Sequence, residues 1–593
     1  MSPIILHAGP LQLAFSSTEG SIRYLYAGEH EVLRGISAPV RDDAWATIAP
    51  EISDLAVVQE DNSFAVTFTA RCRSSLVDFI WQGKIAGSSD GTLVFDFEGE
   101  ALGDFRRNRV GFCVLHGAEV SGQACEIEHV DGSREQGTFP TLIHSGAPFS
   151  GIRAITHRIK TGLDVEVRFE GDVFEMEDQR NWTDASFKTY CTPLAEPRPV
   201  FIAKGTRITQ HVTIRLHGTA KKLQATFSPS WRTPGEVELT IGAPLGWKLP
   251  SLGTIWNKPA EPADQVIANL RSLSLSHLRV DLWLDAADYP LRLRSVVAAA
   301  DKLEVALELA VIANDNIRGQ IARLLAELGE MRPAPRIIRW LVYDQEKEAT
   351  TAAAVTEVRA ALSGSPFAAP VGGGSPDNFA ELNRHPEVAT AGDFTVHACN
   401  PQVHAFDEAS IIETIAQQGT TVANARHLSA GRPVMISPLT LTRRWRINEV
   451  GAPVGLPAAA MPFQIDSRQR SNFAGAWTLG SLSSLAQQGA ASVTGYEAVG
   501  ENGLLASDGL PHPIHGVFKL LAPFVRGAVI ATDVSHPLSL AALALADNER
   551  RILLVANLRN ESQSVKIRGS WGDHSIELSP YRISSIPCAS PAG

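Results

Sequence analysis

The sequence predicts a multidomain chain with three parts: an N-terminal β-sandwich over residues 1–220, a central (β/α)8 TIM barrel over 235–522 and a small C-terminal β-sandwich over 523–593. Two observations predict this fold class. Short runs of alternating apolar and polar residues fill both ends of the chain, whereas strand-like and helix-like patterns alternate in its middle. In addition, 593 residues are too many for a single hydrophobic core.

The N-terminal part consists of short alternating runs that are broken by Gly, Asp, Asn and Ser. Clear examples are FAVTFTARC (64–72), TLVFDFEGEA (92–101), LDVEVRFEGD (163–172) and ITQHVTIRLHG (208–218). Runs of this length with a period of two are typical of antiparallel sheets. Because the sequence has no convincing helical pattern here, we expect a large sandwich.

From about residue 235, apolar strand-like runs alternate with segments of helical periodicity, such as Val266, Ile267, Leu270 and Leu273. The eight strand-like runs are VELTIG (237–242), HLRVDLWL (277–284), EVALELAVI (304–312), RIIRWLVYD (336–344), FAAPVGGG (367–374), FTVHACNP (394–401), PVMISPLTL (433–441) and SVTGYEAVG (492–500). Eight strands with helices between them match the expected size of a barrel, which carries its functional groups at the carboxyl ends of the strands.

After Leu521 the alternating pattern returns, for example in AVIATDVS (528–535), RILLVANLR (551–559) and QSVKIRG (563–569). These runs again have the length and period of strands in antiparallel sheets. They predict the small sandwich at the end of the chain.

The composition is that of a globular protein, with 44% hydrophobic and 20% charged residues. The net charge is -11 and no run is rich in Lys or Arg, so we expect no binding to nucleic acid or to acidic lipid. We expect neither a signal peptide nor a membrane span, because no basic leader and no long uninterrupted apolar stretch is present, and we place the protein in the cytoplasm. The six cysteines are scattered without a CxxC spacing, which predicts reduced thiols.

The densest group of hydrogen-bonding side chains lies in FEMEDQRNWTDASFKTY (174–190), which fits neither a strand nor a helix period. It includes Glu177, Arg180, Asn181 and Lys188, which offer donors and acceptors to a small polyhydroxylated or acidic molecule. A solvated hairpin tip is the alternative. The aromatic residues within the run argue against that alternative, because Trp and Phe anchor a segment. We therefore predict that these four side chains bind substrate.

A second polar run, FRRNRVGFCVLHG (105–117), places three arginines and Asn108 just before a predicted strand. Taken alone, this pattern is more typical of a solvated strand entry than of a binding site.

Polar residues inside apolar barrel strands are informative, because an unpaired buried charge is costly. Arg279 and Asp281 lie two apart and hence on one face of the second strand. An ion pair that only ties barrel layers together is at least as good an interpretation of them as a functional one. Glu308, His397 and Glu497 lie at or near strand ends with no obligate partner adjacent in the sequence, and for these three we predict a functional role.

Three further polar residues near strand ends are candidates for substrate binding. Asn378 follows the fifth strand, where capping of a short helix is the alternative role. Asn400 ends the sixth strand, and Tyr496 precedes Glu497 in the eighth.

A metal site is conceivable at His397, His404 and Asp407. Their spacing matches no established zinc pattern, and the sequence supplies no helical face that would bring them together. We therefore predict neither a metal nor another cofactor.

The predicted architecture is shared by a large clan of barrel glycosidases, which act through two carboxylates. A retaining member would have an Asn-Glu pair after the fourth strand and a Glu on the seventh. Here the fourth strand ends in Tyr343 and Asp344, and PVMISPLTLT (433–442) contains no acid. The chain has the architecture of that clan without its catalytic pair in the expected places.

Four stretches carry a more specific resemblance: MEDQRNWTDASFKTY (176–190), NRVGFCVLH (108–116), VGGGSPDNFAELNR (371–384) and HACNPQVHAFDE (397–408). With them the chain resembles the D-apionate lactonase family over essentially its whole length. That family hydrolyses D-apionolactone to D-apionate in the bacterial breakdown of the branched pentose apiose. The resemblance implies a carboxylic ester hydrolase with a small-molecule sugar lactone as its partner.

Lactone hydrolysis requires a base that activates water, a donor that stabilises the oxyanion and an acid that protonates the departing ring oxygen. We predict water attack assisted by Glu497 or Glu308. Candidate oxyanion donors are Lys188, Arg180, His397 and Asn400, and we expect the segment 177–188 to close the site. The alternatives are a glycoside hydrolase for a small branched sugar and a catalytically silent carbohydrate-binding protein.

Overall fold

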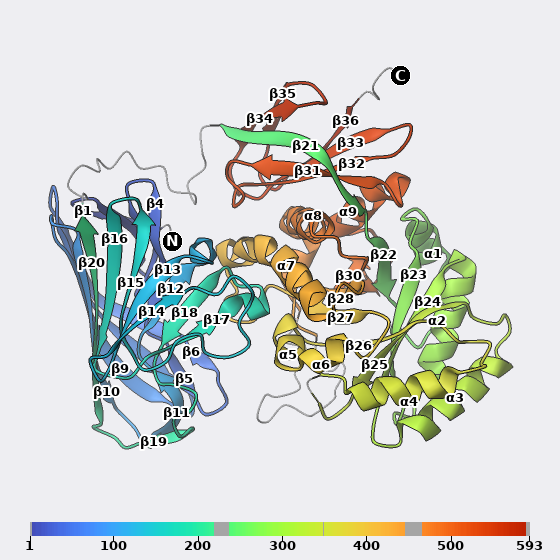
Figure 1. Cartoon of the computed structure of the whole chain (residues 1–593), viewed down its shortest axis with the longest axis horizontal. Helices are drawn as coiled ribbons and strands as arrows, with labels where there is room; N and C mark the ends of the chain where they lie inside the picture. The colour runs from blue at the N-terminus through green and yellow to red at the C-terminus, as the bar shows by residue number, and fades with distance from the viewer. Residues whose placement is uncertain (1–2, 219–235, 348, 445–464, 589–593) are drawn as a thin grey trace. The chain divides into compact units, whose positions relative to one another are not determined.

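The computed structural model describes residues 3–218, 236–347, 349–444 and 465–588. Contacts divide the described chain into two units (Figure 1). The first contains the residues up to Arg180 and from Ala185 to 218. The second contains Asn181–Asp184 and the described residues from 236 onward. A short stretch of the polar segment predicted to bind substrate therefore belongs to the second unit.

The first unit consists of three antiparallel sheets. The seven-stranded sheet has the order β1 (Ile4–Ala8), β2 (Leu11–Ser16), β3 (Ser21–Ala27), β4 (His30–Ser37), β12 (Cys113–Gly117), β18 (Ser186–Tyr190) and β17 (Glu175–Asp178). The nine-stranded sheet has the order β14 (Arg134–Thr138), β13 (Ala124–His129), β15 (Ile152–Lys160), β16 (Leu163–Glu170), β20 (Arg207–Gly218), β10 (Thr92–Ala101), β9 (Asp78–Gly87), β8 (Phe64–Arg73) and β7 (Pro50–Gln59). The four-stranded sheet has the order β19 (Val200–Ile202), β11 (Phe105–Val110), β5 (Val40–Asp42) and β6 (Thr47–Ile48).

One apolar core joins the two large sheets. Phe15 and Ile22 of the seven-stranded sheet belong to the same buried cluster as Phe68, Phe95 and Val165 of the nine-stranded sheet. Because side chains alternate across a strand, the apolar residues of each alternating run share one face and pack inward. The predicted N-terminal sandwich is confirmed. Two short 3-10 helices, η1 (Ala118–Val120) and η2 (Gln179–Trp182), also occur here, the second ending in the residues that join the second unit.

The second unit contains a closed barrel of eight parallel strands, because the first barrel strand also pairs with the last. Its strands are β22 (Ser251–Ile255), β23 (His277–Trp283), β24 (Ala306–Ala313), β25 (Ile337–Asp344), β26 (Val371–Ser375), β27 (Thr395–Cys399), β28 (Val434–Leu439) and β29 (Ser492–Val499), and β30 (Gly503–Leu505) extends the sheet. Its helices are α1 (Asp264–Arg271), α2 (Tyr289–Leu303), α3 (Ile317–Glu330), α4 (Ala352–Leu362), α5 (Phe379–Arg384), α6 (Pro386–Ala389), α7 (Glu408–Leu428), α8 (Asn472–Gln487) and α9 (Pro513–Leu521), with η6 (Ser467–Arg470) and η7 (Ala522–Phe524).

The first barrel strand differs from the prediction. Residues 237–242 belong to β21 (Val237–Lys248), which pairs with β31 (Ala528–Val534) and β34 (Gln563–Gly569) of the C-terminal sheet, and β22 takes the place predicted for them in the barrel. Every second residue of 237–242 is exposed, a pattern that suits a sheet with one covered face. Barrel strands such as β24 are buried on both faces throughout.

The C-terminal part is a seven-stranded sheet. Its order is β35 (His574–Leu578), β34 (Gln563–Gly569), β21, β31 (Ala528–Val534), β32 (Leu540–Ala546), β33 (Arg551–Asn557) and β36 (Ile583–Cys588). Buried apolar residues from β34, β21, β31, β32 and β33 form a single cluster, so strands from across the sheet share one core. The three-part fold class predicted from the sequence is thereby confirmed.

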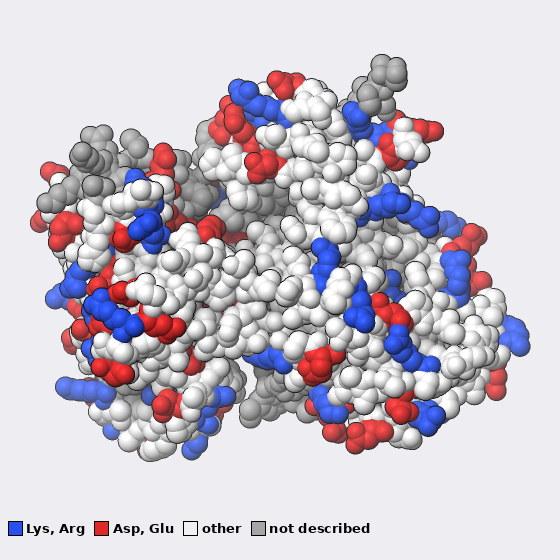
Figure 2. Space-filling view, viewed as in Figure 1, with Lys and Arg blue, Asp and Glu red and all other residues white. Residues whose placement is uncertain are grey.

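Acidic and basic side chains are interspersed on the face of the protein shown in Figure 2. Of the six cysteines, Cys72, Cys125, Cys191 and Cys399 are buried free thiols and Cys113 is a partly buried one. Among the described residues, no helix is both long and apolar enough to cross a membrane.

Candidate active site

A β-bulge in the last barrel strand determines where Glu497 points. On β22, Gly253 and Ile255 are two residues apart, but their partners on β29, Thr494 and Glu497, are three apart. The extra residue is accommodated at Tyr496, whose φ of 57° lies in the left-handed region. Without this bulge, Thr494 and Glu497 would lie on opposite faces of the strand.

Glu497 belongs to a cluster of charged groups near the carboxyl ends of two barrel strands. Nη2 of Arg444 donates to Oε1 of Glu497 at 2.8 Å and to Oδ2 of Asp281 at 2.9 Å. Nδ2 of Asn257 donates to the same Asp281 oxygen at 2.8 Å, and Nε of Arg279 donates to the other at 2.8 Å. Two carboxylates from β23 and β29 therefore share one guanidinium group at the end of a barrel where such enzymes place their catalytic residues.

The two carboxylates of this cluster have pKa values shifted in opposite directions. Burial alone would raise the pKa of Asp281, but the charges of Arg279 and Arg444 outweigh burial and hold it well below its ordinary value. Burial raises the pKa of Glu497, and Asp281 adds to the rise, although Arg444 partly offsets it. Asp281 thus stays ionised, while Glu497, whose side chain is 24% exposed, is suited to exchanging a proton.

Glu308 lies one layer deeper in the barrel, in register with Arg279 and Arg339 on the neighbouring strands. It is fully buried, and it accepts hydrogen bonds from Nε of Arg339 at 2.5 Å, from the Thr494 hydroxyl at 2.9 Å and from the Ser437 hydroxyl. Burial alone would raise the pKa of Glu308, but Arg339 and the other charges around it hold it at about 2. These contacts favour a structural role for Glu308 over the predicted catalytic one.

His397, on β27, is fully buried beside the ring of Phe379, with ring centroids 5.5 Å apart. Nδ1 lies 3.0 Å from the carbonyl oxygen of Ala398, whereas Nε2 has no partner among the described residues. Burial lowers the pKa of His397 to about 4, so its ring is neutral at neutral pH. A neutral imidazole with one unused nitrogen can contact a substrate hydroxyl or carbonyl oxygen.

Asn378 and Asn400 are brought together by the loops that follow β26 and β27. Nδ2 of Asn400 donates to Oδ1 of Asn378 at 3.2 Å, and Oδ1 of Asn400 is buried with no partner in the described part of the chain. Asn378 precedes helix α5, but its side chain makes no capping hydrogen bond there. The alternative capping role is therefore excluded for Asn378.

Residues 181–184 belong to the second unit and contact other loops of that unit. Nδ2 of Asn383 donates to Oδ1 of Asn181 at 2.9 Å, and Oδ2 of Asp184 lies 2.7 Å from Nδ1 of His404. The ring of Trp182 packs edge-to-face against that of His404, with ring centroids 5.2 Å apart. Asn181 thus serves at least to fix this stretch to the loop after β26.

The residues considered as metal ligands have different hydrogen-bond partners. His404 pairs with Asp184, and Asp407 accepts the Ser410 N–H at 3.0 Å as the N-cap of α7. Within the described ranges, no group of three or more His, Cys, Asp or Glu side chains is arranged to hold a metal ion.

In the first unit, Glu177 and Lys188 face each other across β17 and β18 and form an ion pair. Their predicted part in substrate binding stays a prediction. Arg180 donates to both oxygens of Asp178, at 2.8 and 2.7 Å, and also to the Ser121 hydroxyl and the Pro140 carbonyl. Every nitrogen of Arg180 is thereby engaged, which favours a structural role for this side chain.

Three other side chains differ from what the sequence pattern suggests. The hydroxyl of Tyr496 lies 2.6 Å from that of Thr478 on α8, and the ring is fully buried, which favours a structural role at the bulge over the predicted contact with substrate. Asn108 and Arg109 are each only 6% exposed, so the interpretation of their run as a solvated strand entry is wrong.

Sequence reasoning missed Arg444 and Asn257. Both lie in loops that follow barrel strands, Asn257 two residues after β22 and Arg444 five residues after β28. The general rule that functional groups follow strand ends would have included them. The ion pair predicted between Arg279 and Asp281 is present, and Arg444 extends it.

The positions of the catalytic carboxylates in barrel glycosidases, and the one Gly-x-Ser-x-Gly sequence, do not support a different mechanism. Asp344, at the end of the fourth barrel strand, pairs with Lys347 at 2.7 Å, and the seventh strand contains no acid. The sequence contains one Gly-x-Ser-x-Gly stretch, residues 87–91, but it forms the exposed hairpin turn between β9 and β10 and not a strand-to-helix elbow.

Comparison with known proteins identifies the family. The family model "D-apionate lactonase, N-terminal domain" matches residues 1–219, and "D-apionate lactonase, TIM barrel domain" matches residues 253–526. A D-apionate lactonase from Brucella anthropi is 31% identical, over 98% of this chain and 97% of the relative. Among solved structures, a GH30 endoxylanase from Clostridium papyrosolvens is 11% identical over 60% of this chain and 100% of its own, with a TM-score of 0.43. A family 51 α-L-arabinofuranosidase from Bifidobacterium longum is 14% identical over 60% of this chain and 95% of its own, also with a TM-score of 0.43. The similarity over nearly the whole length of both chains shows that this protein belongs to the D-apionate lactonase family.

Proposed function

We propose that the protein hydrolyses D-apionolactone to D-apionate and that Glu497 is the general base. Family membership supports the reaction class. The single observation that carries the residue assignment is the shared contact of Arg444 with Asp281 and Glu497. The reaction is a step in bacterial breakdown of apiose, and its predicted place is the cytoplasm.

The first step is attack by water. The Glu497 carboxylate takes a proton from a water molecule as the water oxygen bonds to the lactone carbonyl carbon. A base is most effective when its pKa lies close to the working pH, so the raised pKa of Glu497 favours this role. Asp281 stays ionised beside Arg444 and keeps the guanidinium group in position.

The carbonyl oxygen becomes an oxyanion in this step and needs a donor. Nη1 of Arg444 is buried and has no hydrogen-bond partner among the described residues, so its N–H groups are available to the oxyanion. The bond between the carbonyl carbon and the ring oxygen then breaks. Glu497 returns the proton to the departing ring oxygen, and ionisation of the new acid releases one proton per turnover.

The substrate hydroxyl groups require polar partners that are not already engaged. Oδ1 of Asn400 and Nε2 of His397 are both buried without a partner among the described residues. Asn378 lies in hydrogen-bond contact with Asn400. We assign these three side chains to recognition of the sugar, since an unsatisfied buried polar atom is costly unless a ligand satisfies it.

The reaction is tested by following proton release from purified protein in a pH-stat across a panel of aldonolactones. We expect D-apionolactone to be hydrolysed fastest, with one equivalent of acid for each lactone consumed. Release of reducing sugar from apiosides without acid would instead indicate the glycoside hydrolase. Saturable binding of sugars without either product would indicate a carbohydrate-binding protein.

A further inference from the structure

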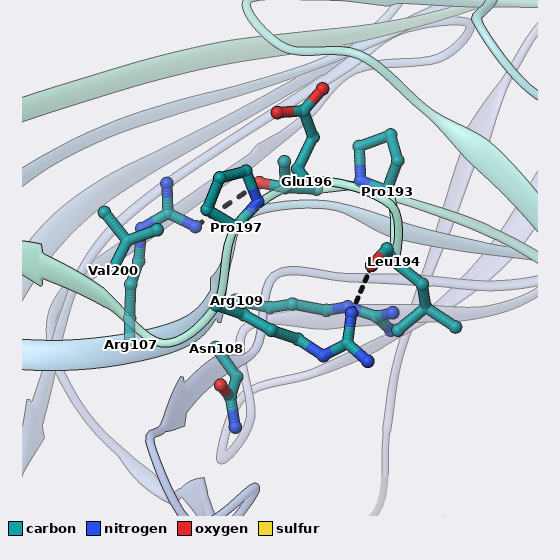
Figure 3. A pocket seen from close by; sticks show the side chains of 10 residues that line it. Arg107, Asn108, Arg109, Pro193, Leu194, Glu196, Pro197 and Val200 are labelled. Carbon is teal, nitrogen blue, oxygen red and sulfur yellow. Dashed lines mark hydrogen bonds between the residues drawn. The ribbon is translucent and has the colours of Figure 1, made fainter.

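A cavity lies entirely within the first unit, outside the cluster around Glu497. It has a volume of about 340 Å³ and is lined by β11 and by the connection from β18 to β19 (Figure 3). Arg107, Arg109 and Arg198 line it together with the apolar side chains of Pro193 and Leu194. We call this cavity the arginine pocket. A pocket of this volume can accommodate a small organic molecule.

The charge of the arginine pocket is unbalanced. Three guanidinium groups line it, and Glu196 is the one acid among its lining residues. In Figure 3 the Glu196 carboxylate points away from Arg109. The nearby Glu175 carboxylate accepts the Tyr190 hydroxyl and, at 2.5 Å, the Leu194 N–H, so it is engaged elsewhere.

Arg109 is the central cation of the pocket. Its side chain is only 6% exposed, and its guanidinium carbon lies 3.7 Å from the centre of the Tyr190 ring and 5.0 Å from that of Trp45. It forms no hydrogen bond or ion pair within the described part of the chain. Ring stacking fixes the plane of the guanidinium group but does not neutralise its charge. A buried cation without an anion is costly, and a bound anion would remove that cost.

Two other arginines line the pocket: Nη1 of Arg198 already donates to the Leu194 carbonyl, whereas Arg107 has one donor unused within the described ranges. The guanidinium carbon of Arg198 lies 5.9 Å from the centre of the same Trp45 ring, so two like charges are gathered around one aromatic side chain. Nε of Arg107 is buried with no partner among the described residues, although its Nη1 donates to the Thr192 hydroxyl at 3.3 Å. The fork of a guanidinium group matches a carboxylate, which it binds through two parallel hydrogen bonds.

We propose that the arginine pocket binds a small organic carboxylate, with its carboxylate on Arg109 and its apolar body against Pro193, Leu194 and Pro197. The apolar wall distinguishes this ligand from inorganic anions, which have no surface to bury there. The binding site belongs to the first unit alone and does not depend on the lactonase reaction.

Benzoate and benzamide provide a matched pair of probes, because they share one shape and differ in charge. We expect isothermal titration of the full-length protein to detect benzoate and not benzamide. Arg109→Gln should weaken benzoate binding by at least about tenfold, since it removes a charge-assisted hydrogen-bonded pair. Arg207→Gln, which removes an arginine that is 81% exposed on β20, serves as the control and should bind as the unmodified protein does.

Arg198→Gln provides a second test should Arg109→Gln fail to fold, because Arg198 is an exposed residue. We expect it also to weaken benzoate binding. Equal binding of benzoate and benzamide, equal binding of inorganic phosphate and benzoate, or unchanged benzoate binding by both pocket variants would each overturn the proposal.

Discussion

Nη2 of Arg444 lies 2.8 Å from Oε1 of Glu497, at the carboxyl end of the last barrel strand. The same nitrogen lies 2.9 Å from Asp281 on the second barrel strand. The pKa of Asp281 is held low by its two arginine partners, and the pKa of Glu497 is raised by burial. Opposite shifts in neighbouring acids assign a permanent charge to one and proton exchange to the other.

Replacement of Arg444 by Met tests the role of the shared guanidinium group. We expect turnover to fall by about a hundredfold or more, because the oxyanion loses its donor. The pKa seen in the profile of kcat/KM against pH should also move upward, since Arg444 lowers the pKa of Glu497. Arg470→Met, which changes an arginine that is 54% exposed, is the matched control. An unchanged pH profile in Arg444→Met would contradict the proposed contact.

The pH dependence of the unmodified enzyme tests the state of Glu497. A base acts only when deprotonated, so kcat/KM should be lost as the pH falls through the pKa of Glu497 and restored as it rises. Because burial raises this pKa, the midpoint should lie above the value of about 4.3 for an ordinary glutamate. Initial rates across buffers of constant ionic strength provide the measurement, and a midpoint at or below the ordinary value argues against Glu497 as the base.

Asp281→Asn should destabilise the fold at neutral pH. The folded-state pKa of Asp281 is depressed, so its ion pairs contribute stability above the unfolded value of about 3.9, and this contribution is lost as the pH falls through the folded value. Breaking a buried pair costs about 3 kcal/mol of unfolding free energy. Urea unfolding followed by fluorescence measures the loss, with the exposed Asp285→Asn as control. If Asp285→Asn lowers the unfolding free energy at pH 7 as much as Asp281→Asn does, the ion pairs of Asp281 are not the cause of the loss.

Glu308→Gln distinguishes the two acids predicted as bases. Glu308 is fully buried and paired with Arg339, so its removal leaves a buried cation and should lower the unfolding free energy by about 3 kcal/mol or more. Folded Glu308→Gln should keep turnover within about tenfold of the unmodified enzyme, because losses of a catalytic group are typically larger. Turnover per folded molecule is the quantity to compare. A stable but inactive Glu308→Gln would restore Glu308 as the catalytic base.

The barrel could be predicted because its strands and helices alternate in the sequence with distinct periods. The error at residues 237–242 has a physical origin, since β21 pairs in parallel with β34, and Val237 lies opposite Val565. The partner of a strand cannot be identified from the local sequence when the two strands are so far apart in the chain. The exposed Glu238 and Thr240 do indicate a sheet with one covered face, and with that reading the short β22 becomes the better barrel strand.

The candidate site was only partly predictable. Glu497 follows from its position near a strand end, but its orientation depends on the bulge at Tyr496, which the sequence does not reveal. Arg444 lies in a loop, and its contact with acids from two separate strands depends on the closure of the barrel. The polar partners of Glu308 lie on other strands as well, so the sequence alone does not show which of Glu308 and Glu497 is the base.

The most direct test of the account compares Glu497→Gln with the unmodified enzyme on D-apionolactone. We predict that turnover falls by about a hundredfold or more, whereas the exposed Glu261→Gln keeps normal turnover. The melting temperature of Glu497→Gln at pH 7 should not fall. Because the folded-state pKa of Glu497 is raised, its contribution to protein stability is lost as the pH rises, and its charge at pH 7 disfavours the folded state. Near-normal turnover by a folded Glu497→Gln would contradict the central claim.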